Sequence, residues 1–189
     1  MENIVIDFVK ELAACRVEGT QLPFYPEKVK GYTEQEIELI AQNCNLDIHG
    51  QFRDFLLQMG KCSGGLLWGD EFYMYSYKWS LKNFFNYQKS AKQDDDMFDK
   101  NGKIDPVGKK IFGLTREYET YFYYLFTDEY DDYVWFLDSA DDAVWEKTNE
   151  TLLDHLKYYV EYKTKQTRFI DFDLTEEQID RGGPTCLNN

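Results

Sequence analysis

Three runs of aromatic and β-branched residues dominate the second half of the chain. The runs are Tyr118–Phe126, Tyr133–Leu137 and Ala143–Lys147, and acidic segments separate them. Residues of these types favour extended strands, and short runs broken by turn-forming segments are typical of antiparallel meanders. We therefore predict an antiparallel sheet built from this half of the chain.

Apolar residues at helical spacing predict helices before and after these strands. The clearest local signal is Thr33, which can cap a helix, with Glu36 placed to complete a capping box. The expected helices are 3–16, 34–43, 52–59 ending at Gly60, a short helix capped by Ser80, and 150–163. Two short strands, 66–68 and 72–75, are predicted around a Gly-Asp turn, and 88–110 is predicted as a long surface loop.

Length and composition favour one α+β domain. The 189 residues suit a single domain, and the 17% of aromatic residues supply ample apolar surface for its core. We expect one mixed or mainly antiparallel sheet packed with helices over 1–189, with the helix 3–16 and the tail 167–189 as extensions. Trp68, Trp135 and Trp145 are expected to pack in the core.

The net charge of −14 narrows the range of partners. It opposes binding to nucleic acid or to an anionic membrane, since both require clustered Lys and Arg, and it attracts basic partners. The first residues lack the pattern of a signal peptide and no long apolar stretch follows, so we expect a cytoplasmic protein. The four cysteines are widely spaced, which favours free thiols over a disulfide framework. Cys186 lies fourth from the end, but its surroundings do not match a lipidation signal.

Few residues suggest catalysis or a cofactor, and we expect neither metal nor cofactor. His49 and His155 are the only histidines, and neither lies in the motif context of a catalytic triad. Cys44, His49 and Cys62 lack the close spacing of zinc ligands. The acidic run before Gly102 does not fit the register of a calcium loop. The glycines between Gly60 and Gly69 form no phosphate-binding fingerprint, so we expect them in tight turns.

The segment from Tyr32 to Tyr75 resembles the N-terminal signature of the SUKH superfamily of Smi/Knr-type domains. The matching features are a capped helix that begins Thr33-Glu34-Gln35-Glu36-Ile37, an aromatic helix that contains Phe52-Arg53-Asp54-Phe55-Leu56, and a Gly-Gly turn before Leu66. The resemblance implies a sheet packed with helices. For bacterial members it implies an immunity protein that neutralises a cognate toxin of a polymorphic system, and for eukaryotic members a regulatory scaffold.

The acidic residues are unevenly distributed. Seven of them lie between Asp128 and Asp142 with no Lys or Arg among them, and a second dense cluster lies nearby in the predicted loop. The predicted partner-binding residues are Asp128, Glu129, Asp131, Asp132, Asp141, Asp142, Asp94, Asp95 and Asp96. They form either a solvated rim that keeps the protein soluble or a landing site for a basic toxin domain.

These features lead to one principal hypothesis and two alternatives. The principal hypothesis is a non-catalytic immunity protein that binds a cognate toxin, plausibly a basic nuclease-type domain, and covers its substrate surface. The first alternative is a regulatory or scaffolding module with no toxin partner. The second is a hydrolase in which His49 acts with nearby carboxylates.

Overall fold

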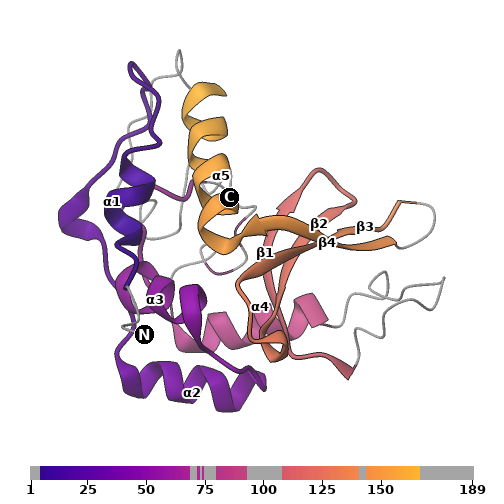
Figure 1. The fold of residues 1–189 in the computed structure, drawn as a ribbon. Helices are drawn as coiled ribbons and strands as arrows, with labels where there is room; N and C mark the ends of the chain where they lie inside the picture. The colour runs from indigo at the N-terminus through magenta and orange to yellow at the C-terminus, as the bar shows by residue number, and fades with distance from the viewer. Residues whose placement is uncertain are drawn as a thin grey trace.

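A four-stranded antiparallel sheet forms one side of the computed structural model (Figure 1). The structure describes residues 5–68, 72, 74, 80–92, 108–140 and 144–166. The strands are β1 (Ile111–Glu117), β2 (Tyr121–Phe126), β3 (Tyr133–Asp138) and β4 (Val144–Thr151), and they pair in sequence order. The predicted α+β class and the antiparallel meander are confirmed.

Five helices accompany the sheet in the described part of the chain. They are α1 (Phe8–Ala13), α2 (Glu34–Cys44), α3 (Gly50–Met59), α4 (Leu81–Lys92) and α5 (Leu152–Gln166). Short 3-10 turns lie at Pro26–Lys28 and Thr127–Glu129. The predicted capping box is confirmed, because Thr33 Oγ1 accepts from the Glu36 amide at 3.3 Å and Glu36 Oε2 accepts from the Thr33 amide at 2.9 Å. Helix α1 is shorter than predicted because Asp7 caps it, accepting from the Lys10 amide at 3.0 Å.

Strand β1 was not predicted from the sequence. Gly113 interrupts its apolar run, and a shift in register between Gly113 and Thr115 breaks the simple alternation of side chains. The predicted surface loop from residue 88 is also wrong at its start, since α4 continues to Lys92. Gln88 is buried in this helix and makes hydrogen bonds to the backbone of β1. Its Nε2 donates to the Ile111 carbonyl, and its Oε1 accepts from the Gly113 amide at 3.2 Å.

The predicted strand at residues 66–68 is wrong. Gly64 and Gly65 have φ angles of 64° and 95°, and the chain then continues as bends. A Cβ on Gly64 would lie 2.4 Å from the Tyr25 carbonyl oxygen, so glycine is required at this turn. In the second predicted strand, Phe72 forms an isolated bridge with Thr115, while Tyr73 and Tyr75 lie outside the described residues.

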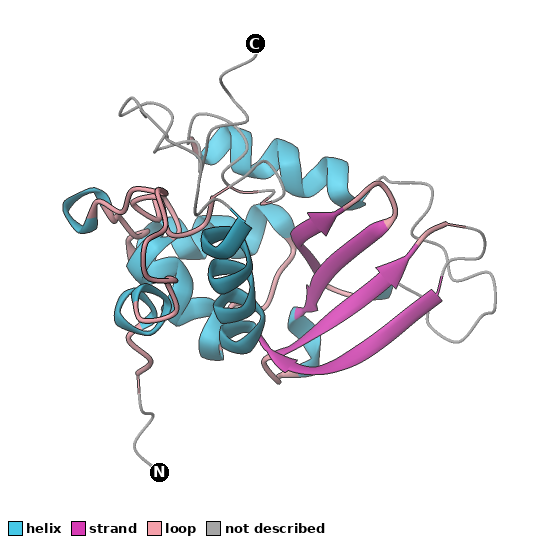
Figure 2. Ribbon diagram, turned by 90° about the horizontal axis from the view of Figure 1, so that it is seen from above, coloured by secondary structure: helices cyan, strands magenta, loops and turns pink. Residues whose placement is uncertain are grey.

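The two faces of the sheet bury separate sets of side chains. Figure 2 shows most of the helices gathered on one side of the sheet, and Phe112, Leu125 and Val134 join the main core there. The opposite face carries its own aromatic cluster, which includes Trp135 and Trp145. Trp68 is buried as well, so the predicted core packing of the three tryptophans is confirmed.

Candidate functional site

The connection between β2 and β3 gathers four of the predicted binding residues. We call Asp128, Glu129, Asp131 and Asp132 the acidic corner. Here the chain turns through the 3-10 turn at Thr127–Glu129, and Tyr130 then adopts a left-handed conformation with φ of 49°. Asp131 Oδ1 accepts from the Tyr133 amide at 3.1 Å and starts the next strand. The local hydrogen bonds therefore fix the backbone on which these carboxylates stand.

Lysines from neighbouring elements partly neutralise the acidic corner. Lys147 of β4 donates to Glu129 at 2.9 Å and to Asp131 at 2.6 Å. Lys109 lies 3.2 Å from Glu129, and Lys110 lies 2.7 Å from Asp47 beside the corner. Five carboxylates, with Asp47 included, thus face three ammonium groups, which leaves an excess of two negative charges. The sequence shows no basic residue within this acidic stretch because these lysines come from elsewhere in the chain.

This pairing changes the ionisation of the corner. Burial of the Glu129 carboxyl acts to raise its pKa, but hydrogen bonds from Lys147 and Lys109 outweigh burial and the pKa is lowered. Burial acts to lower the pKa of Lys147, but its hydrogen bonds to Asp131 and Glu129 prevail and the pKa is raised. Both groups therefore carry their charges over a wider pH range than usual.

Asp132 connects the acidic corner to helices α3 and α5 through hydrogen bonds. Its Oδ1 accepts from the Gln51 amide at 2.8 Å in the first turn of α3, and its carbonyl accepts from the Leu152 amide at 2.8 Å at the start of α5. A Cβ on Gly50 would lie 2.4 Å from Asp132 Oδ1, so the close approach depends on that glycine. Asp132 therefore has a structural role whether or not it also contacts a partner.

Five other predicted binding residues lie outside the described part of the chain. They are Asp94, Asp95, Asp96, Asp141 and Asp142. The same holds for Cys186 and for the acidic run compared with a calcium loop. Their role in binding stays a prediction.

Two exposed tyrosines accompany the acidic corner. The Tyr130 side chain is 75% exposed and stacks on the His49 ring with centroids 4.9 Å apart. The Tyr133 side chain is 41% exposed, and the Lys147 ammonium lies 5.6 Å from its ring centroid. Exposed aromatic rings among charged groups are common at the centres of protein interfaces. From the sequence we predicted that aromatic residues near the acidic loops take part in binding, but neither Tyr130 nor Tyr133 could be singled out.

His49 is held by contacts that serve the fold. Its Nε2 lies 2.9 Å from the Thr127 carbonyl oxygen, which can only accept, so this nitrogen carries a proton. The cavity that His49 lines with Asp131 and Asp132 has a volume of about 10 Å³. A cavity of that size holds no more than one water molecule. His49 and Asp132 also line a separate, open hollow of about 540 Å³ together with Arg53 and Asp54, so a role of His49 beside carboxylates stays a prediction.

His155 belongs to a buried hydrogen-bonded group. Its Nε2 lies 2.9 Å from Thr115 Oγ1, and its Nδ1 lies 3.8 Å from the Glu150 carboxylate. The nearby His155 imidazole lowers the pKa of Glu150. A hydroxyl, an imidazole and a carboxylate follow here in the order of a hydrolytic triad. Thr115 is fully buried and His155 is 2% exposed, so no substrate reaches the hydroxyl.

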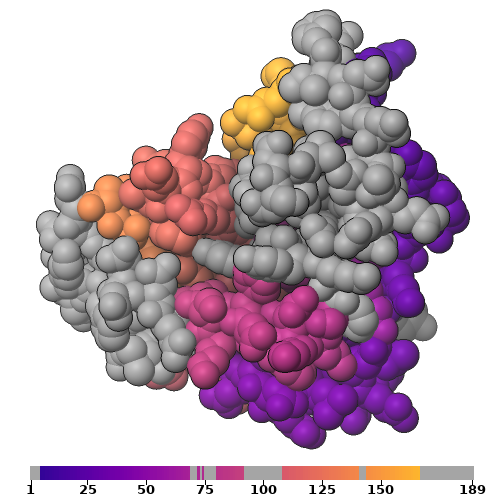
Figure 3. All heavy atoms as spheres, turned by 180° about the vertical axis from the view of Figure 1, so that it is seen from behind, coloured from indigo at the N-terminus to yellow at the C-terminus, as the bar shows by residue number. Residues whose placement is uncertain are grey.

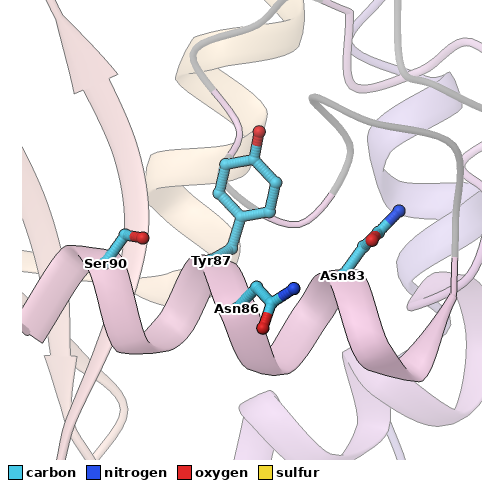
Figure 4. Close-up of a pocket in the computed structure, with 4 residues that line it drawn as sticks. All are labelled: Asn83, Asn86, Tyr87 and Ser90. Carbon is cyan, nitrogen blue, oxygen red and sulfur yellow. The ribbon is translucent and has the colours of Figure 1, made fainter.

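A hollow on α4 offers polar but uncharged groups. It has a volume of about 340 Å³ and is lined by Asn83, Asn86, Tyr87 and Ser90 (Figure 4). Figure 3 shows this helix at the surface beside α2. These amides and hydroxyls bind through hydrogen bonds and carry no charge at neutral pH. Across the described residues, no group of three or more His, Cys, Asp or Glu side chains is placed to hold a metal ion.

Comparisons with known proteins gave no relative. No family model matches the chain, and no curated protein or solved structure matches it. Among the helices of the described residues, none is both long enough and apolar enough to cross a membrane.

Proposed function

We propose that this chain is an immunity protein of the SUKH type that binds a cognate polymorphic toxin and blocks it by occupying its surface. The resemblance of Tyr32–Tyr75 to the SUKH signature motivates the family assignment. The antiparallel sheet packed with helices agrees with the fold which that resemblance implies. In this proposal the protein acts by binding alone.

The observation that carries the proposal is the exposed Tyr130 within the acidic corner. A tyrosine in the left-handed region is strained, and glycine or asparagine fits there at lower cost. Tyr130 nevertheless places a ring that is 75% exposed over His49, beside carboxylates held by backbone hydrogen bonds. Strain of this kind is commonly retained where a side chain has a binding role. A rigid aromatic group also binds with little loss of conformational freedom.

Charge makes a basic toxin domain the matching partner. The chain carries a net charge of −14, and the acidic corner keeps an excess of two negative charges after pairing with lysine. Such a surface speeds association with a positively charged protein and slows it with a negatively charged one. Nuclease-type toxins need basic surfaces to hold nucleic acid. A protein seated on that surface would exclude the substrate.

The function is tested by co-expression with the toxin domain encoded beside this chain. The proposal predicts that growth is restored and that the two proteins purify together. If both proteins are soluble and neither result is obtained, the proposal is wrong. A complex with a partner that has no toxic activity would instead favour the regulatory scaffold.

The role of the corner is tested separately with isosteric substitutions. Asp128→Asn, Glu129→Gln and Asp131→Asn together remove three negative charges while keeping the side-chain shapes. The matched control neutralises Glu18, Glu27 and Glu38, which are exposed glutamates elsewhere, so the net charge changes equally. Slower association in the corner variant alone, with the difference shrinking at high salt, supports the site. Equal rates in the two variants would rule it out.

A further inference from the structure

A second exposed aromatic surface lies at the other end of β2. The turn between β1 and β2 carries Tyr118, which is 76% exposed and has a left-handed φ of 56°. Figure 1 places this turn and the acidic corner at opposite ends of the sheet. We call this group of rings the tyrosine surface. It consists of the exposed Tyr118 and Tyr158 and the partly buried Tyr121, Phe136 and Tyr162.

Ring contacts join the sheet residues of this surface into one layer. Tyr118 meets Tyr121 edge to face at 5.9 Å, and Tyr121 meets Phe136 at 5.3 Å. Phe136 in turn lies 5.4 Å from Tyr123, which packs against His155 of α5 at 4.6 Å. A buried hydrogen bond with Thr115 holds His155 in place beneath these rings. The exposed rings therefore stand on a well-packed base.

Helix α5 contributes the other side of the surface. Tyr158 is 53% exposed and stacks on Tyr162 with ring centroids 6.0 Å apart. Tyr162 and Tyr118 line the same cavity, of about 230 Å³, together with Glu117. Burial raises the pKa of Tyr158, and Glu117, Tyr162, Glu150 and Tyr118 raise it further, in agreement with this arrangement. Tyr118 from the turn and Tyr162 from the helix thus line one shallow hollow.

Carboxylates surround these rings without lysine or arginine partners. Glu117 pairs with Tyr121 across the strands, Tyr121 with Asp138, and Phe136 with Glu146, so these side chains share one face. Glu150, at the end of β4, interacts with His155. Within the described part of the chain, no Lys or Arg lies within ion-pair distance of Glu117, Asp138, Glu146 or Glu150. The acidic corner differs, because Lys109 and Lys147 pair with its carboxylates.

The nearby basic groups leave this negative charge in place. Lys163 lines the hollow, where its ammonium lies 5.4 Å from the Tyr159 ring centroid. Arg116 points away toward Phe122 on the opposite face, while its guanidinium donates to the Tyr118 carbonyl at 3.0 Å and fixes the turn. Two cations thus lie near the four carboxylates, and one of them, Arg116, packs against the opposite face of the sheet.

We propose that the tyrosine surface is the docking site for an arginine-bearing segment of a partner protein. The planar guanidinium group stacks on tyrosine rings and donates two parallel hydrogen bonds to a carboxylate, a geometry that a lysine ammonium does not provide. Exposed rings beside carboxylates that have no lysine or arginine partner among the described residues supply both kinds of contact. This inference rests on the proposed function, since the basic toxin is the expected source of the segment.

The test uses a tetra-arginine peptide as the probe, titrated into the full chain and followed by NMR. Tyr118→Leu removes the ring face but keeps apolar bulk. Leu39→Ala is the control, since Leu39 is an apolar residue of α2 that is 46% exposed and belongs neither to the tyrosine surface nor to the acidic corner. We expect Tyr118→Leu combined with Tyr158→Leu to weaken peptide binding about tenfold, or about 1.4 kcal/mol, and Leu39→Ala to leave it unchanged.

Three results would overturn the inference. They are no binding of the peptide, equal loss in the Leu39→Ala control, and equal affinity for a tetra-lysine peptide. The outcome is separable from that of the proposed function. If the peptide binds at the tyrosine surface but the chain protects from no toxin, the immunity role is refuted and the docking site stands. If a chain that carries Tyr118→Leu and Tyr158→Leu protects fully, the docking site is refuted and the immunity role stands.

Discussion

Replacing Lys147 by methionine tests how the acidic corner is held together. The substitution keeps the length of the side chain but removes the ammonium group that joins Glu129 and Asp131. Lys147 is 35% exposed in its side chain, so water screens both pairs. Ion pairs of this kind contribute about 0.2–1 kcal/mol each. The free energy of unfolding should therefore fall by about 1 kcal/mol, and the melting temperature by roughly 2–4 °C.

The pH dependence of this loss follows from the direction of the pKa shifts. The pKa of Glu129 is lowered in the folded protein, so its stabilising effect is complete above its unfolded pKa of about 4.3 and disappears as the pH falls through the folded value. The pKa of Lys147 is raised, so its contribution lasts until the pH rises through that higher value. The cost of Lys147→Met should thus be full at about pH 7 and smaller at about pH 3.

Urea unfolding followed by circular dichroism at both pH values measures this cost. Lys10→Met is the control, because Lys10 is exposed and no carboxylate lies within ion-pair distance of it in the described part of the chain. An equal loss of stability at both pH values, or an equal loss in the control, would show that the pairing with Glu129 and Asp131 is not the cause.

Three further predictions follow from other contacts. Gln88→Leu leaves the Ile111 carbonyl and the Gly113 amide without their partner in a buried site, so unfolding experiments should show a loss of about 2–6 kcal/mol. Asp132→Ala removes the acceptor of the Gln51 amide and should cost about 1–3 kcal/mol, with hydrogen exchange rising first at the start of α3. Tyr118→Leu should change the melting temperature by less than about 2 °C, since that ring is exposed. A large loss of stability there would show that the ring serves the fold.

Local patterns predicted those elements whose signals lie within a few residues. The capping box at Thr33 and Glu36 and the meander of β2, β3 and β4 depend on neighbours in sequence or on side-chain type. Strand β1 and the end of α4 could not be found this way. Gln88 is polar, yet it is buried because the backbone of β1 satisfies its amide group. That pairing joins residues 25 positions apart.

The candidate site likewise combines a part that local sequence patterns reveal with a part that depends on residues distant in sequence. The sequence located the acidic segment from Asp128 to Asp132, but the lysines that neutralise it come from positions 109, 110 and 147. The tyrosine surface is likewise divided between the turn at Tyr118 and the helix at Tyr158. Spatial neighbours of this kind leave no mark in a one-dimensional pattern.

A titration of toxin activity with the purified chain tests the central claim most directly. Inhibition by occupancy predicts that activity falls in proportion to the amount of added protein and is abolished at one chain per toxin molecule, at once and reversibly. Inactivation that proceeds with time at far smaller amounts would mean that the chain acts as an enzyme. Unchanged activity at a large excess of the chain would contradict the proposal that it binds and neutralises the toxin.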